Sequence, residues 1–318
     1  GSGSGSASIG AQPERSLALA FRFMSERVRG QQERLTTVLA ERTADLETVR
    51  QALAERSDLY RLREELSLAR DLQLSLLPNP AKLASVQDRI QLASITRPAK
   101  EVGGDSYDYQ LLDGGRRLLF LVCDSSGKGV PAAMFVLSSR ALASAASEAL
   151  GRLDSGLTVA NSALARENDA LSFTTMFIGL LDLDTGLLCY SNAGHNPPLL
   201  QRAGGAIERL DQATGLVLGA MEGIPYEQAE CTLAPGDTLI VYSDGITEAH
   251  DQASVLFGTE RLELACAAAA GASPARYIEQ LLDAVDRHAA DTPQFDDITL
   301  MVMRYQPAAR IQSSSAAG

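Results

Sequence analysis

Residues 116–129 read RRLLFLVCDSSGKG, and this stretch is the most informative one about the fold. The apolar run from Leu118 to Cys123 is typical of a strand buried in a sheet. Asp124 follows the run directly, so its carboxylate is held by rigid backbone and still reaches solvent. The glycines at positions 127 and 129 leave room for a cation or a phosphate close to the backbone. The stretch therefore predicts a buried sheet with a charged site at the end of one strand.

The segments around this strand indicate the fold class. The expected strands are residues 89–95, 116–123, 173–182, 187–192, 238–242 and 298–305, and the expected helices are residues 130–150, 259–270 and 274–288. The turn Asp184-Thr185-Gly186 marks a hairpin. Helices before, between and after antiparallel strands predict an α/β fold in which two antiparallel β-sheets form a sandwich flanked by helices. Regular βα alternation is missing, which argues against a Rossmann sheet or a barrel.

A long helix is expected before the sheets. Residues 16–77 contain no Pro and one Gly, and they are rich in strong helix formers. An apolar residue recurs every seven positions, as in a coiled-coil seam, at Leu39, Leu46, Leu53 and Tyr60. The apolar series then changes phase and continues from Leu62, which can mark a joint between two helices. Two interpretations stay open: a parallel dimer, and one long amphipathic helix packed on its own domain.

The composition argues against several classes of partner and site. The formal net charge is −12, and residues 1–80 carry 11 Arg and 11 Asp plus Glu, so the excess negative charge lies after residue 80. Such a surface repels nucleic acid and anionic lipid. The four cysteines form no CxxC pair, which argues against a disulfide framework or a thiolate zinc site. With three histidines, any metal is expected to have oxygen ligands. On charge alone, however, a solubilising acidic surface is the favoured interpretation.

The two ends of the sequence and its hydropathy bear on location. The opening GSGSGS at residues 1–6 is interpreted as an added linker, and the Ser/Ala-rich residues 307–318 as a disordered tail. No run approaches the roughly 18 to 20 apolar residues of a membrane span, and a secretory signal is absent. We therefore expect the protein as given to be cytoplasmic. Attachment of a longer protein to the inner membrane, upstream of this sequence, is compatible with that expectation.

Four acidic elements fall at strand ends or in turns. Asp105 closes the stretch EVGGD, Asp124 follows the buried strand, Asp244 follows the strand at 238–242, and Asp296-Asp297 opens the last strand. Converging carboxylates repel one another unless a cation lies among them. A single Asp-Gly pair is usually a turn, but four such elements in one acidic domain favour a metal site. The SGKG motif beside Asp124 lacks the Ser or Thr that follows Lys in a phosphate-binding P-loop.

These segments resemble the PPM-type metal-dependent Ser/Thr phosphatases, in the bacterial branch that regulates sigma factors in sporulation and stress response. The similar motifs follow the expected order across residues 69–305, which makes the resemblance specific. They are ARDLQLSLLPNP at 69–80, RPAKEVGGD at 97–105 with Tyr107-Asp108, DSSGKGVPAA at 124–133, NAGHNPP at 192–198, PGD and YSDGITE within 233–248, and FDDIT at 295–299. Ser106 and Ser125 replace the Phe and Val that the family often has, which leaves substrate fit and rate open.

The resemblance implies a phosphatase domain at residues 85–306 that uses two Mn²⁺ or Mg²⁺ ions. In this family two such ions activate a bridging water for in-line attack on the phosphoryl group. The implied metal ligands are Asp105, Asp124, the carbonyl of Ser125, Asp244, and one of Asp296 and Asp297. Asp296 is favoured over Asp297, Asp124 would bridge both ions, and the catalytic roles fall on Asp105 and Asp124. His195 is expected to be structural or to line the site rather than to bind metal.

The resemblance also implies a partner and a form of regulation. The expected substrate is phosphoserine or phosphothreonine on a small protein that antagonises an anti-sigma factor. Residues 16–34 resemble the second helix of a HAMP signal-relay module, so we expect a HAMP-like remnant at 7–34. Residues 35–77 would then be a coiled-coil switch-helix stalk that forms a homodimer and regulates the enzyme. A catalytically inactive binding module, or a dimeric scaffold with a structural cation site, stays open, and phosphate release with and without Mn²⁺ separates the three.

Overall fold

The computed structural model describes residues 11–166 and 168–307, with side chains from residue 15 onward. The chain divides into two compact units, residues up to Glu65 and residues from Leu66 on. The expected linker, residues 7–10 of the HAMP-like segment and nearly all of the expected tail lie outside the described residues. The sequence placed the start of the phosphatase domain at residue 85. The second compact unit also includes the residues from Leu66 to that point, among them Leu83, which packs in its core.

The first unit is a helix. It belongs to α1, which spans Ala11–Ser75 and confirms the long helix expected from the sequence. The phase change near Leu62 does not interrupt α1, so the two helices suggested by the phase change form one. Apart from Gly30, every residue from Arg15 to Glu65 is exposed in the single chain. The exposed residues include the four apolar positions of the heptad column, whose pairing with a second chain stays a prediction.

Two sheets form the frame of the second unit. One has the strand order β1-β11-β10-β6-β7, with β1 at Ile90–Arg97, β11 at Ile298–Tyr305, β10 at Thr238–Tyr242, β6 at Leu199–Gln201 and β7 at Ile207–Arg209. The other has the order β2-β3-β4-β5-β8, with β9 also on β5, and comprises β2 at Asp105–Leu112, β3 at Arg117–Ser125, β4 at Thr174–Asp182, β5 at Leu187–Ala193, β8 at Thr214–Gly215 and β9 at Ala229–Thr232. The strand pairs are antiparallel, except for β5 with β8.

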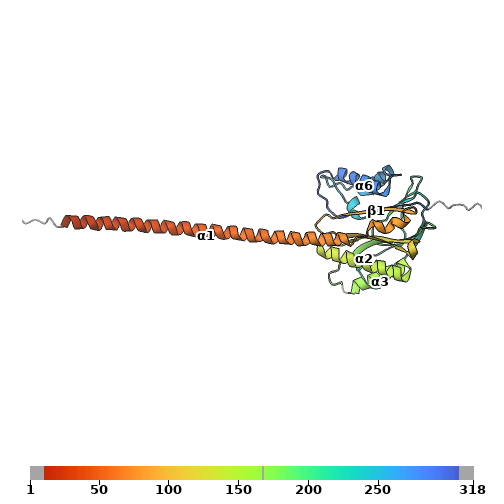
Figure 1. Cartoon of the computed structure of the whole chain (residues 1–318), viewed down its shortest axis with the longest axis horizontal. Coiled ribbons are helices and arrows are strands. Elements are labelled where there is room, and N and C mark those ends of the chain that lie inside the picture. Colours follow the sequence, from red (N-terminus) through yellow and green to blue (C-terminus); the bar gives the residue numbers. More distant parts are fainter. Residues whose placement is uncertain (1–10, 167, 308–318) are drawn as a thin grey trace, which may run out of the picture. The chain divides into compact units, whose positions relative to one another are not determined.

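Helices cover the outer faces of the two sheets (Figure 1). The helices α2 (Val130–Leu150) and α3 (Leu153–Arg166) lie on the sheet that contains β3, and α5 (Gly258–Ala268) and α6 (Pro274–Ala289) lie on the sheet that contains β11. The short elements are η1 (Pro80–Val86), η2 (Asp113–Gly115) and α4 (Asp244–Thr247). Side chains from both sheets, among them Tyr109, Phe120, Val241 and Met301, form the central core. The predicted two-sheet sandwich with flanking helices is confirmed.

The sequence reasoning missed two longer elements. It assigned nothing to β2, because Asp105, Asp108 and Gln110 break the apolar pattern of a buried strand. It also missed α3, whose Gly, Thr, Val and Asn residues are weak helix formers. Packing of α3 against α2 overrides that weakness: a Cβ atom at Gly156 would lie 2.2 Å from Ser147 Oγ, so the glycine permits the close approach of the two helices.

The helix α2 is the one described helix that is long and apolar enough, by length and composition, to cross a membrane. Its apolar residues have another explanation in this fold. Ala133, Val136 and Ala143 are buried beneath the sheet of β2 and β3, and 44% of its most apolar window lies inside the protein. This pattern is that of the core helix of a folded domain.

Candidate active site

The acidic residues singled out by the sequence meet at one end of the two sheets. Asp105 begins β2 and lies directly opposite Asp124 of β3. Asp244 follows β10 of the other sheet, and Asp296 and Asp297 precede β11. Asp124 interacts electrostatically or by hydrogen bonding with each of the other four carboxyl groups. The fold therefore brings all five predicted aspartates together from segments that are far apart in the sequence.

Asp105 and Asp124 are the buried centre of this cluster. Burial, followed by the charge of Asp124, raises the pKa of Asp105 well above its usual value. Burial, followed by the charge of Asp244, raises the pKa of Asp124 to about 7. Burial and the neighbouring Glu248 raise the pKa of Asp244 to about 6. Loss of water around like charges causes these shifts, and a cation among the carboxylates would oppose them.

Asp297 is held by backbone groups on the loop before β2. The N–H of Ala99 donates to its Oδ1 at 2.6 Å, and the N–H of Gly104 donates to its Oδ2 at 2.5 Å. A Cβ atom at Gly103 would lie 2.9 Å from the same Oδ2, so the position needs a glycine. Asp296 is engaged as well, since its Oδ1 accepts the N–H of Asp297 at 2.9 Å, but it is the more exposed of the two. Asp296 as the favoured metal ligand stays a prediction.

Asp296 contacts Lys128, a residue to which the sequence reasoning assigned no role. The ammonium of Lys128 lies 3.0 Å from Asp296 Oδ2 and donates to the carbonyl of Phe295 at 2.7 Å. It also lies 4.3 Å from the centroid of the Phe295 ring. The available signal was its place between Gly127 and Gly129, in the loop that follows Asp124. The loop belongs to the motif DSSGKGVPAA, but its failure to fit the P-loop pattern left Lys128 without a predicted role.

Ser125 is buried behind Asp124, and its side chain bonds to backbone. Its Oγ donates to the carbonyl of Ala132 at 2.8 Å, and its N–H donates to the carbonyl of Gly104 at 3.0 Å. These bonds connect the loop after β3 to α2 and to the loop before β2. The role predicted for Ser125 therefore falls on its carbonyl oxygen and not on its hydroxyl.

His195 lies in a buried turn beside the cluster. Its Nδ1 is 2.8 Å from the hydroxyl of Thr175, and Thr175 lies opposite Asp124 across β3 and β4. The His195 N–H donates to Asn192 Oδ1 at 2.7 Å, and Asn192 Nδ2 donates back to the His195 carbonyl at 3.0 Å. Burial lowers the pKa of His195 to about 4. A neutral imidazole in this position suits the structural role expected from the sequence.

The last turns of α1 reach the same loop through Gln73, which the sequence reasoning also missed. Gln73 is 6% exposed, its Nε2 donates to the carbonyl of Gly103 at 2.8 Å, and its Oε1 accepts the N–H of Gly103 at 3.1 Å. Arg140 of α2 donates to the carbonyl of Leu76 at 3.1 Å. The signal in the sequence was one glutamine between Leu72 and Leu74. These contacts connect α1 to the backbone that precedes Asp105.

The residues of the cluster fit divalent cations by charge and chemistry. Asp105 Oδ2 is buried without a hydrogen-bond partner, which is costly unless a cation satisfies it. A Cβ atom at Gly245 would lie 2.0 Å from the Asp297 carbonyl, so the backbone is closely packed around the cluster. Among the described residues, no three His, Cys, Asp or Glu side chains are already arranged to hold a metal. The donor set of five carboxyl groups, one with a buried and unpartnered oxygen, is of the kind that Mg²⁺ and Mn²⁺ prefer.

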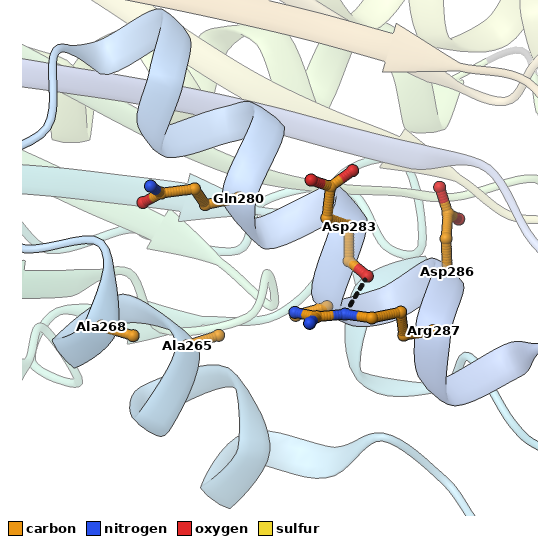
Figure 2. Close-up of a pocket in the computed structure, with 7 residues that line it drawn as sticks. Ala265, Ala268, Gln280, Asp283, Asp286 and Arg287 are labelled. Atoms are coloured by element: carbon orange, nitrogen blue, oxygen red, sulfur yellow. Dashed lines mark hydrogen bonds between the residues drawn. The ribbon is translucent and has the colours of Figure 1, made fainter.

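A pocket is lined by residues of α5 and α6 (Figure 2). Small side chains such as Ala265 and Ala268 line it, together with Asp283, Asp286 and Arg287. Arg287 donates to the Asp283 carbonyl at 3.0 Å, and Asp286 pairs with Arg97 at 2.7 Å. None of the five clustered aspartates lines this pocket, so we place the active site at the sheet ends.

Comparison with known proteins identifies the family. The family described as stage II sporulation protein E (SpoIIE) matches residues 114–306. The chain belongs to the SpoIIE family. It is similar to protein IcfG of Synechocystis, with 30% identity over 76% of this chain and 41% of IcfG. It is also similar to the phosphoserine phosphatase RsbU of Bacillus subtilis, with 25% identity over 76% of this chain and 70% of RsbU.

Solved structures of other bacterial proteins show a similar fold. The SiaA-PP2C domain of Pseudomonas aeruginosa has a TM-score of 0.69 and 24% identity, over 78% of this chain and 98% of that domain. A Mycobacterium tuberculosis protein with RsbU and RsbW domains has a TM-score of 0.59 and 27% identity, over 70% of this chain and 61% of that one. The second unit of the chain therefore has the fold of a PP2C-type domain. The chain spans less than half of IcfG, so activity, substrate and partners of the whole protein are proposals.

Proposed function

We propose that the chain is a metal-dependent protein serine/threonine phosphatase. The observation that carries this proposal is the pairing of Asp105 with Asp124 across β2 and β3, with Asp105 Oδ2 buried and unpartnered. Asp244 and Asp296 complete an acidic site at the ends of both sheets. The SpoIIE-family match and the similarity to the phosphoserine phosphatases RsbU and RsbP support the reaction class.

Each candidate ligand has a role in the proposed reaction. Two Mn²⁺ or Mg²⁺ ions, when bound, would activate a water and neutralise the phosphoryl oxygens. Asp105, Asp124, Asp244, Asp296 and the Ser125 carbonyl would hold them. Asp297 would not bind directly. It would keep the loop of Gly104 in place, so that Asp105 stays opposite Asp124.

Phosphate release from an aryl phosphate and from a phosphoserine peptide tests this proposal. Activity should disappear when a chelator is added and return with Mn²⁺ or Mg²⁺. Asp124→Ala should lower kcat by on the order of a thousandfold or more, because several kcal/mol of transition-state stabilisation depends on the metals. Asp283→Ala, on the outer face of α6, is the matched control and should retain activity. Full activity of Asp124→Ala would exclude the two-metal reaction and favour another mechanism. No activity in any metal would favour an inactive binding module.

The proposed substrate is a phosphoserine or phosphothreonine on a small protein of the anti-sigma-factor-antagonist type. The support is the similarity to RsbU and to a structure in which RsbU and RsbW domains occur together. Addition of the chain and Mn²⁺ to a cell extract, followed by quantitative phosphoproteomics, would identify the protein that loses phosphate. If the protein that loses phosphate is of another class, the substrate proposal is wrong, although the phosphatase assignment would stand.

We also propose that the helical stalk regulates the enzyme. The support is the bidentate contact of Gln73 with Gly103, two residues before Asp105. A change in the packing of α1 would move this backbone and thereby alter how well the metals are held. Such control requires two helix arrangements of different stability. The heptad column would pair two chains, and signals would arrive through the HAMP-like segment, with this part of the protein in the cytoplasm.

A further inference from the structure

We propose that Lys128 pairs with Asp296 only while Asp296 binds no metal ion. Once Asp296 becomes a metal ligand, Lys128 turns to the phosphoryl group of the substrate. This inference rests on the proposed phosphatase function and adds a residue to it. Lys128 would thus have two roles. It would oppose metal binding at Asp296, and it would bind the substrate's phosphate in the loaded enzyme.

The contacts of Lys128 allow it to change partners without leaving the site. Its ammonium has three N–H donors. One donates to the Phe295 carbonyl at 2.7 Å, and another faces Asp296 at 3.0 Å. The Phe295 ring, 4.3 Å from the ammonium, adds a cation–π attraction that does not depend on Asp296. The carbonyl and the ring would therefore keep the ammonium at the rim of the site after Asp296 has turned away.

The backbone on either side of Lys128 leaves open space around the side chain. Gly127 and Gly129 have φ angles of 88° and 84°, and a Cβ atom at either position would meet nothing within 4 Å. The side chains of Lys128 and Asp296 are 32% and 30% exposed, so a phosphate from solvent can reach both. Both side chains are thus partly exposed, and a substrate can reach them.

Charge gives the direction of the exchange. A carboxylate with an ammonium at 3.0 Å cannot accept a divalent cation without bringing two positive charges together, so the Lys128 contact and the metal compete for Asp296. A phosphoserine monoester carries a charge of about −1.5 to −2 near pH 7 and offers three acceptor oxygens. It is therefore a stronger partner for the released ammonium than any other described group on this rim.

Calorimetry on the full chain tests both halves of the proposal. After chelator treatment, Lys128→Met should bind Mn²⁺ about three- to tenfold more tightly than the natural sequence, because the competitor for Asp296 is gone. The same variant, saturated with Mn²⁺, should bind inorganic phosphate about tenfold more weakly, because a charge-assisted hydrogen bond is lost. A merely structural effect would move both affinities in the same direction.

Two further variants make the test specific. Lys128→Arg keeps the charge and should bind phosphate nearly as well as the natural sequence. Lys100→Met removes a lysine from the neighbouring loop and should change neither affinity. Unchanged Mn²⁺ affinity in Lys128→Met would overturn the competition, and unchanged phosphate affinity would overturn the exchange. If Lys100→Met changed both affinities as much as Lys128→Met does, the loss of any nearby positive charge would explain the effect, and the proposal would be wrong. Failure of the natural sequence to release phosphate from an aryl phosphate with Mn²⁺ would instead count against the proposed function.

Discussion

At the scale of single residues, the site combines buried carboxylates that destabilise the metal-free fold. Asp105 is 4% exposed, it lies opposite Asp124, and one of its oxygens has no partner among the described groups. Residues arranged for function in this way commonly reduce stability. The cost belongs to the protein without metal, since bound cations would offset the repulsion.

Asp105→Asn should therefore stabilise the metal-free chain while it weakens metal binding. Burial beside Asp124 raises the pKa of Asp105, so folding without metal must either bury its charge or protonate it. A neutral amide of the same shape removes that cost, and we expect a gain of about 1 to 3 kcal/mol in unfolding free energy. Urea unfolding in chelator measures the gain. In the natural sequence, Mn²⁺ should raise the urea midpoint, and in the variant this increase should be smaller. A less stable metal-free variant would contradict the interpretation.

His195 should make stability depend on pH. Its pKa in the fold is about 4, below the ordinary 6.5, because it is buried as a neutral ring. The unfolded chain therefore takes up this proton first as the pH falls. The contribution of neutral, buried His195 to the free energy of unfolding is fully present above pH 6.5, and it is lost as the pH falls from 6.5 toward 4. Between these limits it amounts to about 2 to 3 kcal/mol.

His195→Gln removes this titration and keeps a side chain that can hydrogen-bond to Thr175. We expect the unfolding free energy of the natural sequence, measured in chelator, to fall by about 2 to 3 kcal/mol more than that of the variant between pH 7 and pH 4. The carboxylates titrate in both proteins, so the difference between the curves isolates His195. Parallel curves would show that the imidazole is not buried in its neutral form.

At the scale of elements, α1 contacts the active-site loop through one side chain. Gln73 satisfies both the N–H and the carbonyl of Gly103, and the next turn receives a hydrogen bond from Arg140. The N–H of Gly104 in turn holds Asp297. A rotation of the last turns of α1 would therefore first move the backbone of Gly103 and Gly104, beside Asp105.

Insertions near Ser57 test whether this connection regulates the enzyme. One inserted alanine turns the following helix by about 100° relative to the upstream heptad column, whereas seven inserted residues return it to within about 20°. The single insertion should change the phosphatase rate at limiting Mn²⁺, and extra Mn²⁺ should partly restore slow variants. The seven-residue insertion is the matched control and should behave like the natural sequence.

Gln73→Leu should abolish the response to these insertions, because it removes both hydrogen bonds to Gly103. Gln51→Leu, an exposed substitution on the same helix, should leave the response intact. If the rate and the metal dependence were the same in every insertion variant, the stalk would be a tether, and its regulatory role would be excluded.

At the scale of the whole molecule, the heptad column should decide the oligomeric state. Leu39, Leu46, Leu53 and Tyr60 are 53 to 70% exposed in the single chain. A second chain would bury this column, so light scattering of the full chain at micromolar concentration should report a dimer. A chain that begins at Leu66, where the compact unit starts, should be mostly monomeric. A monomeric full chain would argue against the coiled coil.

The sequence by itself determined the two-sheet sandwich, the long helix and the five acidic positions at strand ends. These features could be predicted because apolar runs and the carboxylates that follow them are patterns among residues close together in the sequence. The contacts of Asp297, Lys128 and Gln73 could not be predicted in this way. Their partners lie 193, 168 and 30 positions away in the chain, at Gly104, Asp296 and Gly103. Periodicity carries no information about such distant contacts, because they exist only once the two sheets and α1 have packed together.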